Sequence, residues 1–357
     1  MKSIVIEGVR CKYADRVLRE RGIIVSFRKK VLVLCLTAVL AVITGCSGND
    51  ADDPVPAVTD KIDDDVQYKQ EEDKVEEEET IPDDGHFHGE YVVTGDYAKD
   101  RIGAEDALFI DARGWQKAVL GTLKGAIATT WQDLCTCQEG QAGDAGWGKI
   151  PAPDDLEKRL GELGITKDKE IIVFADTVDG WGDDARLVWE FLAAGFADVK
   201  MIDGGYAAAK AAGAETQLFA SGAEPGEVTV DKIDNTHVMT TEELQENYDD
   251  YTIVDVRTDE EYNGAILYNE AQGGHLPGAI HVRYTDLFQE DGTLKPNQEL
   301  IEMFESAGVD KDDKVVTYCT GGIRSAYTQL VLEMCGYENT WNYDQSFWRW
   351  SVVGEVE

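Results

Sequence analysis

The sequence predicts an α/β protein made of two tandem copies of one domain, each a mostly parallel sheet flanked by helices. Three observations lead to this prediction. The chain has 357 residues, enough for about two domains. Short apolar runs that read as buried strands alternate with segments of helical periodicity, which is typical of parallel sheets covered by helices. The chain also contains an internal repeat.

Three segments of the first half recur in the second half. The matched pairs are FIDAR (109–113) with IVDVR (253–257), GTLKGAI (121–127) with GHLPGAI (274–280), and LGITKDKEIIVFA (163–175) with AGVDKDDKVVTYC (307–319). The first pair (109 and 253) and the third pair (163 and 307) share one offset of 144 residues. The two copies are therefore about equally long, and the chain is a duplicated domain.

Composition limits the classes of partner. Hydrophobic residues make up 43% of the chain, which allows real cores, and the formal net charge is −37. A charge of this sign argues against nucleic acid and against anionic lipid surfaces as partners. The seven cysteines do not follow the spacing of a disulfide framework.

Residues 1–45 have the pattern of an export signal. A basic cluster at 28–30 precedes the apolar run Val31 to Ile43, which has the length of a signal-peptide core and is too short to span a bilayer. The run ends in a segment that resembles a bacterial lipobox and implies lipidation of Cys46. We therefore expect a lipid-anchored protein at the cell membrane, facing outside the cytoplasm; an ordinary signal peptide is the alternative. Because about 27 residues precede the basic cluster, we expect the true start further downstream, with Val25 as a candidate.

The stretch 46–87 differs from the rest of the chain. Its acidic runs, such as Asp63 to Asp65 and Glu76 to Glu79, come with few aromatic residues and cannot form a core. We expect a disordered, self-repelling tether that carries the lipidated cysteine at its start. An acidic metal-binding tail is the less favoured alternative.

The stretch from Lys314 to Gly336 carries the candidate chemistry. The apolar run Val315 to Tyr318 predicts a buried strand, Cys319 follows it, and helical periodicity begins after a glycine-bearing loop. A thiol at such a place faces several backbone N–H groups and the positive end of a helix, which lowers its pKa. Arg324 adds a permanent positive charge. An ordinary buried cysteine is the alternative.

The spacing of this loop narrows the chemistry. Four residues separate Cys319 from Arg324, whereas cysteine phosphatases place five there and so cradle a tetrahedral phosphate. The shorter loop suits one extra sulfur atom on the thiol, a persulfide. In this respect it resembles the active-site loop of the rhodanese sulfurtransferases.

Further segments extend this resemblance over nearly all of residues 88–353. They are VDVRTDEEY (254–262), GHLPGAIHV (274–282), DGTLKPNQELIEMFESAGV (291–309) and NYDQSFWRW (342–350), which has Gln345 where the family frequently has glycine. The resemblance implies two tandem rhodanese-like domains, at 88–222 and 237–357, joined by a linker at 223–236. It also implies that the second domain is the catalytic one.

The first domain departs from the family pattern at the corresponding loop. By the offset of 144, Ala175 takes the place of Cys319, and Asp176 begins a longer loop rich in carboxylates. Tandem rhodaneses are similarly unequal, with a degenerate first half that shapes the cleft. Trp115 and Trp181 are candidate walls facing Cys319; ordinary packing is the alternative for both.

The resemblance implies sulfur transfer in two steps. The Cys319 thiolate takes the outer sulfur of a small anionic donor, thiosulfate or 3-mercaptopyruvate, and passes it to cyanide or a thiol. Backbone N–H groups of the loop would stabilise the anionic sulfur. The loop residues expected to bind substrate are Thr320, Gly321, Gly322, Ile323, Arg324 and Ser325. Arg324 is expected either to bind the anionic head of the donor or to brace the loop through backbone carbonyls, and the arginine itself is more typical of single-domain members.

Other polar residues of the second domain are given supporting roles. We expect Arg257 to pair with Glu261 or Asp255, Arg283 to lie at the surface rather than in the cleft, and His275 to be structural. No set of His, Cys and carboxylate residues has zinc spacing, so neither a metal nor a cofactor is predicted.

Three more cysteines require an interpretation. Cys135 and Cys137 flank one threonine within an insertion at 132–150, and can be a redox pair, a metal clip or two thiols without a special role. We expect the last. Cys335 is expected to be buried packing.

Two rival functions remain at this point. A non-catalytic sulfur-relay or redox-sensing lipoprotein would use Cys319 with little turnover of small molecules. A cysteine phosphatase or arsenate reductase is argued against by the short loop.

Overall fold

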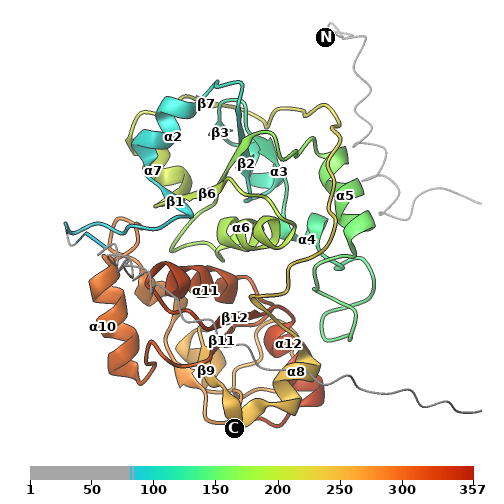
Figure 1. Ribbon diagram of the computed structural model, residues 1–357, viewed down its shortest axis with the longest axis vertical. Helices are drawn as coiled ribbons and strands as arrows, with labels where there is room; N and C mark the ends of the chain where they lie inside the picture. Colours follow the sequence, from blue (N-terminus) through green and yellow to red (C-terminus); the bar gives the residue numbers. More distant parts are fainter. Residues whose placement is uncertain (1–80, 83) are drawn as a thin grey trace, which may run out of the picture. The chain divides into compact units, whose positions relative to one another are not determined.

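A computed structural model of the protein describes residues 81–82 and 84–357 (Figure 1). The predicted signal peptide, the lipidation at Cys46 and nearly all of the acidic tether lie outside the described residues. Within the described part of the chain, no helix has the length and apolarity needed to cross a membrane.

The first domain is built on a five-stranded parallel sheet with the strand order β1-β6-β5-β2-β4. Its strands are β1 (Val92–Val93), β2 (Ala107–Asp111), β4 (Ile127–Ala128), β5 (Glu170–Phe174) and β6 (Val199–Ile202), and a separate antiparallel pair is formed by β3 (Thr122–Leu123) and β7 (Thr216–Gln217). Its helices are α2 (Gly95–Arg101), α3 (Trp115–Ala118), α4 (Trp131–Leu134), α5 (Pro153–Glu162), α6 (Asp183–Ala193) and α7 (Gly205–Ala211).

The second domain repeats this topology. Its sheet has the order β10-β9-β11-β12-β8, which matches the first sheet strand for strand when read from the other edge, and all its pairs are parallel. The strands are β8 (Val238–Met239), β9 (Thr252–Asp255), β10 (Ile280–His281), β11 (Val315–Tyr318) and β12 (Thr340–Tyr343). The helices are α8 (Thr241–Glu246), α9 (Asp259–Tyr262), α10 (Asn297–Ala307), α11 (Arg324–Met334) and α12 (Ser346–Val353), with 3-10 turns η1 (Tyr248–Asp250) and η2 (Tyr284–Leu287). The predicted α/β class, the duplication and the parallel sheets are thus confirmed, and the predicted linker at 223–236 contains no helix or strand.

The central strands β5 and β11 are buried along their whole length. β11 reads as an unbroken apolar or β-branched run, and β5 does so after its first residue, Glu170, because helices cover both faces of a parallel sheet. At the end of each strand the chain turns through a loop into a long helix, α6 after β5 and α11 after β11. The third repeat segment therefore ends where the two candidate loops begin.

Helices α6 and α11 pack against each other and join the two domains through a continuous core (Figure 1). The contact is reciprocal at the helix starts. Arg186, the fourth residue of α6, donates from Nη1 to the Gly322 carbonyl just before α11 (3.0 Å). Tyr327, the fourth residue of α11, packs so closely on Gly182 before α6 that a Cβ there would lie 3.2 Å from the tyrosine Cβ. This packing places the first domain beside the loop that carries Cys319.

Candidate active site

Cys319 directly follows β11, and the chain curls from it into α11 through the loop Thr320–Ile323. Two glycines make this tight curl possible. Gly322 has φ +83°, and a side chain there would collide with the backbone carbonyl of Asp344. A Cβ on Gly321 would overlap the ring of Trp348. The loop therefore tolerates no side chain at either position.

The Cys319 sulfur is held by the loop that follows it. The Gly322 N–H donates to Sγ at 3.2 Å, and the Ser325 hydroxyl lies 3.7 Å from it. Burial alone would raise the pKa of the Cys319 thiol, but the charge of Arg324 and hydrogen bonds from Ser325 and the Gly321 backbone together hold it below its ordinary value. The site thus favours a thiolate.

Of the two roles expected for Arg324, the structure does not show bracing through backbone carbonyls, and binding of the donor's anionic head stays a prediction. Its guanidinium donates to both oxygens of Glu261 (2.8 and 2.7 Å) and to the Thr320 hydroxyl (2.9 Å), which in turn donates to Glu261 (2.6 Å). It therefore braces the loop through a carboxylate and a hydroxyl rather than through backbone carbonyls. Both Nη groups of this buried cation are paired, whereas its Nε has no hydrogen-bond partner in the described chain. The loop donor that reaches the Cys319 sulfur is the Gly322 N–H.

Glu261 is the site residue that the sequence reasoning missed. Burial would raise its pKa, but Arg324 and the hydrogen bonds of Thr320 and Thr258 lower it to about 2. A local signal placed this carboxylate, because Thr258 and Glu261 form a capping box at the start of α9. Nothing in the sequence pattern indicated that the same side chain also reaches Arg324, 63 residues away.

Arg257 serves the frame of the domain rather than the loop. Of its two expected partners the structure selects Asp255 (2.6 Å), and the guanidinium also donates to the Gly274 carbonyl (2.8 Å). Arg283 is exposed and pairs with Asp286 and with Asp259, the first residue of α9, as expected for a surface role. His275 bonds the Tyr262 carbonyl and stacks on its ring, which fits a structural role.

The first domain contributes two side chains around the loop. Besides holding the Gly322 carbonyl, Arg186 donates to the Gly148 carbonyl (3.3 Å). The ring of Trp181 lies under the Arg324 guanidinium at 4.8 Å. Trp115, by contrast, is 55% exposed at the start of α3 and makes no aromatic or cation–π contact within the described chain. Of the two candidate walls, only Trp181 has an aromatic or cation–π contact beside the loop within the described chain, with Arg324.

The insertion of the first domain is docked on the second domain. Gln345 Nε2 lies within hydrogen-bonding distance of the carbonyls of 144, 145 and 147, at 3.2, 3.1 and 3.0 Å. Trp147 meets the ring of Trp348 edge-on with centroids 5.0 Å apart, and Arg349 donates to the Gly143 carbonyl (3.0 Å). Gln345, which stands where the family frequently has glycine, is therefore an anchor for segment 143–148.

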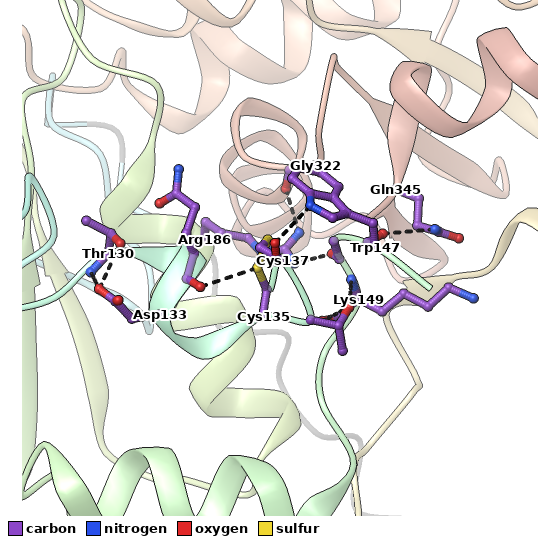
Figure 2. The surroundings of a disulfide bond; sticks show 12 residues. Thr130, Asp133, Cys135, Cys137, Trp147, Lys149, Arg186, Gly322 and Gln345 are labelled. Atoms are coloured by element: carbon purple, nitrogen blue, oxygen red, sulfur yellow. Dashed lines mark hydrogen bonds between the residues drawn. A yellow bond between two sulfur atoms is a disulfide. The ribbon is translucent and has the colours of Figure 1, made fainter. Parts of the chain in front are cut away.

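Cys135 and Cys137 form a disulfide bond (Figure 2), so the expectation of two ordinary thiols was wrong. The sulfur atoms meet because Cys135, directly after α4, has an extended conformation and the chain bends at Thr136. Cys335, in contrast, is a free and buried thiol, and burial raises its pKa to about 12. Its expected role as packing is confirmed.

The candidate site is enclosed. Cys319 is only 1% exposed, and Thr320, Arg324 and Ser325 are also buried. No group of three His, Cys, Asp or Glu residues in the described chain is placed to hold a metal ion. The catalytic and binding roles of the loop residues stay predictions.

The sequence of this chain is similar to that of known proteins over both domains. A family model described as a rhodanese-like domain matches twice, at residues 94–212 and 240–352. A protein of Mycolicibacterium smegmatis named "Putative thiosulfate sulfurtransferase" is 29% identical over 285 residues, covering 74% of this chain and 95% of the relative. A protein of the same name from Haloferax volcanii is 28% identical over 252 residues, covering 64% and 80%.

The fold of this chain is similar to that of several solved structures. The anaerobic ergothioneine biosynthesis enzyme from Chlorobium limicola, in complex with trimethyl histidine, superposes with a TM-score of 0.64 at 19% identity, covering 75% of this chain and 70% of that one. YnjE gives a TM-score of 0.58 at 21% identity, with 71% and 62% covered. At these identities the structural likenesses concern the fold alone.

Proposed function

This chain belongs to the rhodanese family, and we propose on that premise that it moves sulfane sulfur from a small anionic donor to an acceptor through a persulfide on Cys319. The names of the relatives support sulfurtransferase activity. The observation that carries the proposal is a buried thiol of lowered pKa at the end of β11, with the Gly322 N–H of the following loop directed at its sulfur.

The first step loads the enzyme. The Cys319 thiolate attacks the outer sulfur of thiosulfate, the sulfur–sulfur bond of the donor breaks, and sulfite leaves with the electron pair. The loop N–H groups that face the thiolate also face the outer sulfur of the persulfide, so they stabilise the negative charge in both states. 3-Mercaptopyruvate is the alternative donor, with pyruvate as the product.

The second step regenerates the thiolate. An acceptor thiolate or cyanide attacks the outer sulfur, the persulfide bond breaks, and its electron pair returns to Cys319. The product is a new persulfide or thiocyanate. In this scheme the Glu261–Arg324 pair fixes the loop through Thr320, and Trp181 covers the guanidinium.

We also propose that the protein is anchored to the membrane through Cys46 and faces outside the cytoplasm. The basic cluster, the apolar run and the cysteine in sequence support it. The Cys135–Cys137 disulfide gives independent support, since disulfides persist mainly in oxidising compartments. Release of a Cys46→Ser variant from the membrane fraction would support the anchor, and unchanged membrane association would contradict it.

Intact mass of the purified protein tests the sulfur transfer. We expect thiosulfate to add the mass of one sulfur, cyanide to remove it with formation of thiocyanate, and the Cys319→Ser variant to gain nothing. A gain with 3-mercaptopyruvate alone would keep the mechanism and change the donor. No gain with either donor would contradict small-molecule turnover and favour a sulfur relay or redox sensor that uses the same cysteine. Hydrolysis of an aryl phosphate would instead favour a phosphatase.

A further inference from the structure

The Cys135–Cys137 disulfide closes a loop of only three residues. Such a short loop removes little conformational entropy from the unfolded chain, so this bond adds little to the stability of the fold. We propose that it is a thiol-exchange site for small thiols and dithiols, and that its redox state sets how firmly segment 143–148 covers the Cys319 loop. The second half of this proposal rests on the function proposed for Cys319.

The two sulfur atoms differ in accessibility. Cys137 is half-buried, whereas Cys135 is fully buried. An external thiolate therefore attacks the Cys137 sulfur, the disulfide breaks, and Cys135 leaves as a thiolate that takes up a proton. A second thiol then attacks the mixed disulfide, so two thiols become one disulfide and both cysteines end reduced. The Cys135 sulfur lies 3.8 Å from the Gln132 carbonyl, which gives the new thiol a hydrogen-bond acceptor.

The turn that contains the disulfide is bonded directly to the covering segment. Thr136, between the two cysteines, receives a hydrogen bond from the Lys149 N–H and donates to the Gly146 carbonyl (2.9 and 2.6 Å). The Trp147 indole donates to the Cys137 carbonyl at 3.1 Å (Figure 2). The disulfide thus fixes the Thr136 hydroxyl and the Cys137 carbonyl, to which residues 146–149 are attached.

The same segment is bonded to the catalytic domain on its other side. The Gln345 amide reaches three of its carbonyls, and the Trp147 ring meets Trp348, which closes over Gly321 of the loop. Arg186 completes the connection, because its guanidinium spans the carbonyls of Gly148 and Gly322 (Figure 2). A continuous set of contacts therefore runs from the disulfide to the loop that holds Cys319.

Reduction removes the covalent restraint at one end of these contacts. The turn at 135–137 then gains backbone freedom, and the hydrogen bonds to 146–149 weaken, so segment 143–148 opens more often. The thiols that unload a persulfide are the same chemical class as those that reduce this disulfide. The enzyme is therefore more open when acceptor thiols are abundant.

The test follows the disulfide and Cys319 in one sample. The full-length protein is stripped of sulfane sulfur with cyanide, equilibrated in glutathione buffers of increasing reducing strength, and desalted. Peptide mass after alkylation gives the fraction of Cys135 and Cys137 reduced, and the rate at which iodoacetamide modifies Cys319 reports access to the loop. We expect the disulfide to open while the protein stays folded, and alkylation of Cys319 to become about tenfold faster.

Two variants separate the covering segment from the disulfide. The double variant Cys135→Ser/Cys137→Ser should alkylate at Cys319 as fast as the reduced protein without any reductant. Gln345→Ala should do so with the disulfide intact, because the segment loses its anchor. Gln138→Ala, an exposed neighbour of Cys137, is the matched control and should behave as the wild type.

Two results would overturn the proposal. One is a disulfide that dithiothreitol does not reduce in the folded protein. The other is reduction without any change in the alkylation rate of Cys319. Cys335 serves as the internal reference, since its buried thiol should stay unmodified throughout. Neither readout requires sulfur transfer, so a failure of this proposal and a failure of the proposed activity are distinguishable.

Discussion

The two domains share a frame and differ in their loops. In each domain an arginine two residues after an aspartate pairs with that aspartate and donates to the carbonyl of a matched glycine. The contacts are Arg113 to Asp111 (2.7 Å) and to Gly121 (2.8 Å), and Arg257 to Asp255 (2.6 Å) and to Gly274 (2.8 Å). These groups are present with and without the cysteine, so they stabilise the fold and carry no chemistry.

The charges around the two loops are reversed. In the second domain the anionic Glu261 of α9 pairs with the cationic Arg324, the first residue of α11 after the loop. At the matched position of α3 the first domain has Lys117, which pairs with Asp176 of its loop (3.1 Å). The helix after the loop begins with Arg324 and Ser325 in one domain, but with the carboxylates 183 and 184 in the other. The difference teaches that a few side chains at one strand end, rather than the fold, make a thiolate site.

The largest expected effect is on sulfur uptake, when the thiol is moved from residue 319 to residue 175. In a Cys319→Ser background, Ala175→Cys places a thiol at the equivalent strand end, and we expect no sulfur uptake by intact mass. Asp184 Oδ2 already accepts from the N–H of residue 175 (3.1 Å), so the new thiol would face a carboxylate that disfavours a thiolate. Sulfur uptake at residue 175 would show that the frame alone suffices.

The next largest effect is on the free energy of unfolding, and it distinguishes the Glu261–Arg324 pair from the Lys117–Asp176 pair. Glu261→Gln leaves Arg324 buried without its counter-ion, and we expect a loss of about 3–5 kcal/mol of unfolding free energy. Lys117→Gln is the matched control, because Lys117 is 61% exposed and its pair with Asp176 contributes about 0–1 kcal/mol. Denaturant unfolding measures both variants. Equal losses of unfolding free energy would contradict the prediction that the buried Glu261–Arg324 pair stabilises the protein more than the exposed Lys117–Asp176 pair.

A smaller effect is expected on the pH dependence of stability, and it comes from the packed helices α6 and α11. Glu190 of α6 occupies the helix position that α11 fills with Val331, and both its oxygens lack hydrogen-bond partners within the described chain. Burial raises its pKa from 4.5 to about 7, with Asp344 adding to the effect and Arg186 opposing it. The folded protein thus keeps a proton that the unfolded chain releases near pH 4.5.

Stability from this group is therefore complete below about pH 4.5 and is lost as the pH rises towards about 7, by at most about 3 kcal/mol. Glu190→Gln should flatten this slope, as measured by the unfolding midpoint at a series of pH values. Parallel curves for the variant and the wild type would contradict a protonated Glu190 in the folded protein.

The smallest effect tunes the thiol itself. Ser325→Ala removes the hydroxyl that lies 3.7 Å from the Cys319 sulfur, and its partner Asn342 stays in place. The pKa of Cys319 should rise, so the pH profile of its alkylation should move to higher pH. Thr328→Ala, whose hydroxyl bonds only the Arg324 carbonyl, is the control and should leave the profile unchanged.

What is local in sequence was predictable. The strand Val315–Tyr318 was placed at the residues where the structure has β11, and the loop and helix follow as expected. This worked because strand, loop and helix are contiguous, so apolar patterning and two glycines were enough. The duplication was also readable, since it needs only comparison of the chain with itself.

Features that depend on contacts between distant segments could not be predicted from the sequence. Arg186 meets Gly322 across 136 residues, and Gln345 holds carbonyls about 200 residues away. The patterning of either segment gives no information on such pairs, because each is specified by the packing of two domains. The disulfide was missed for another reason: two cysteines around one threonine look the same in sequence whether oxidised or reduced.

The reciprocal contact between α6 and α11 makes this single chain equivalent to a fused heterodimer. Each half inserts one side chain, Arg186 or Tyr327, at the start of the other half's helix. Substitutions in the first copy at Arg186 or Trp181 therefore reach the Cys319 loop or its neighbour Arg324 directly. Duplication of one domain has in this way made the first copy a structural support for the Cys319 loop of the second.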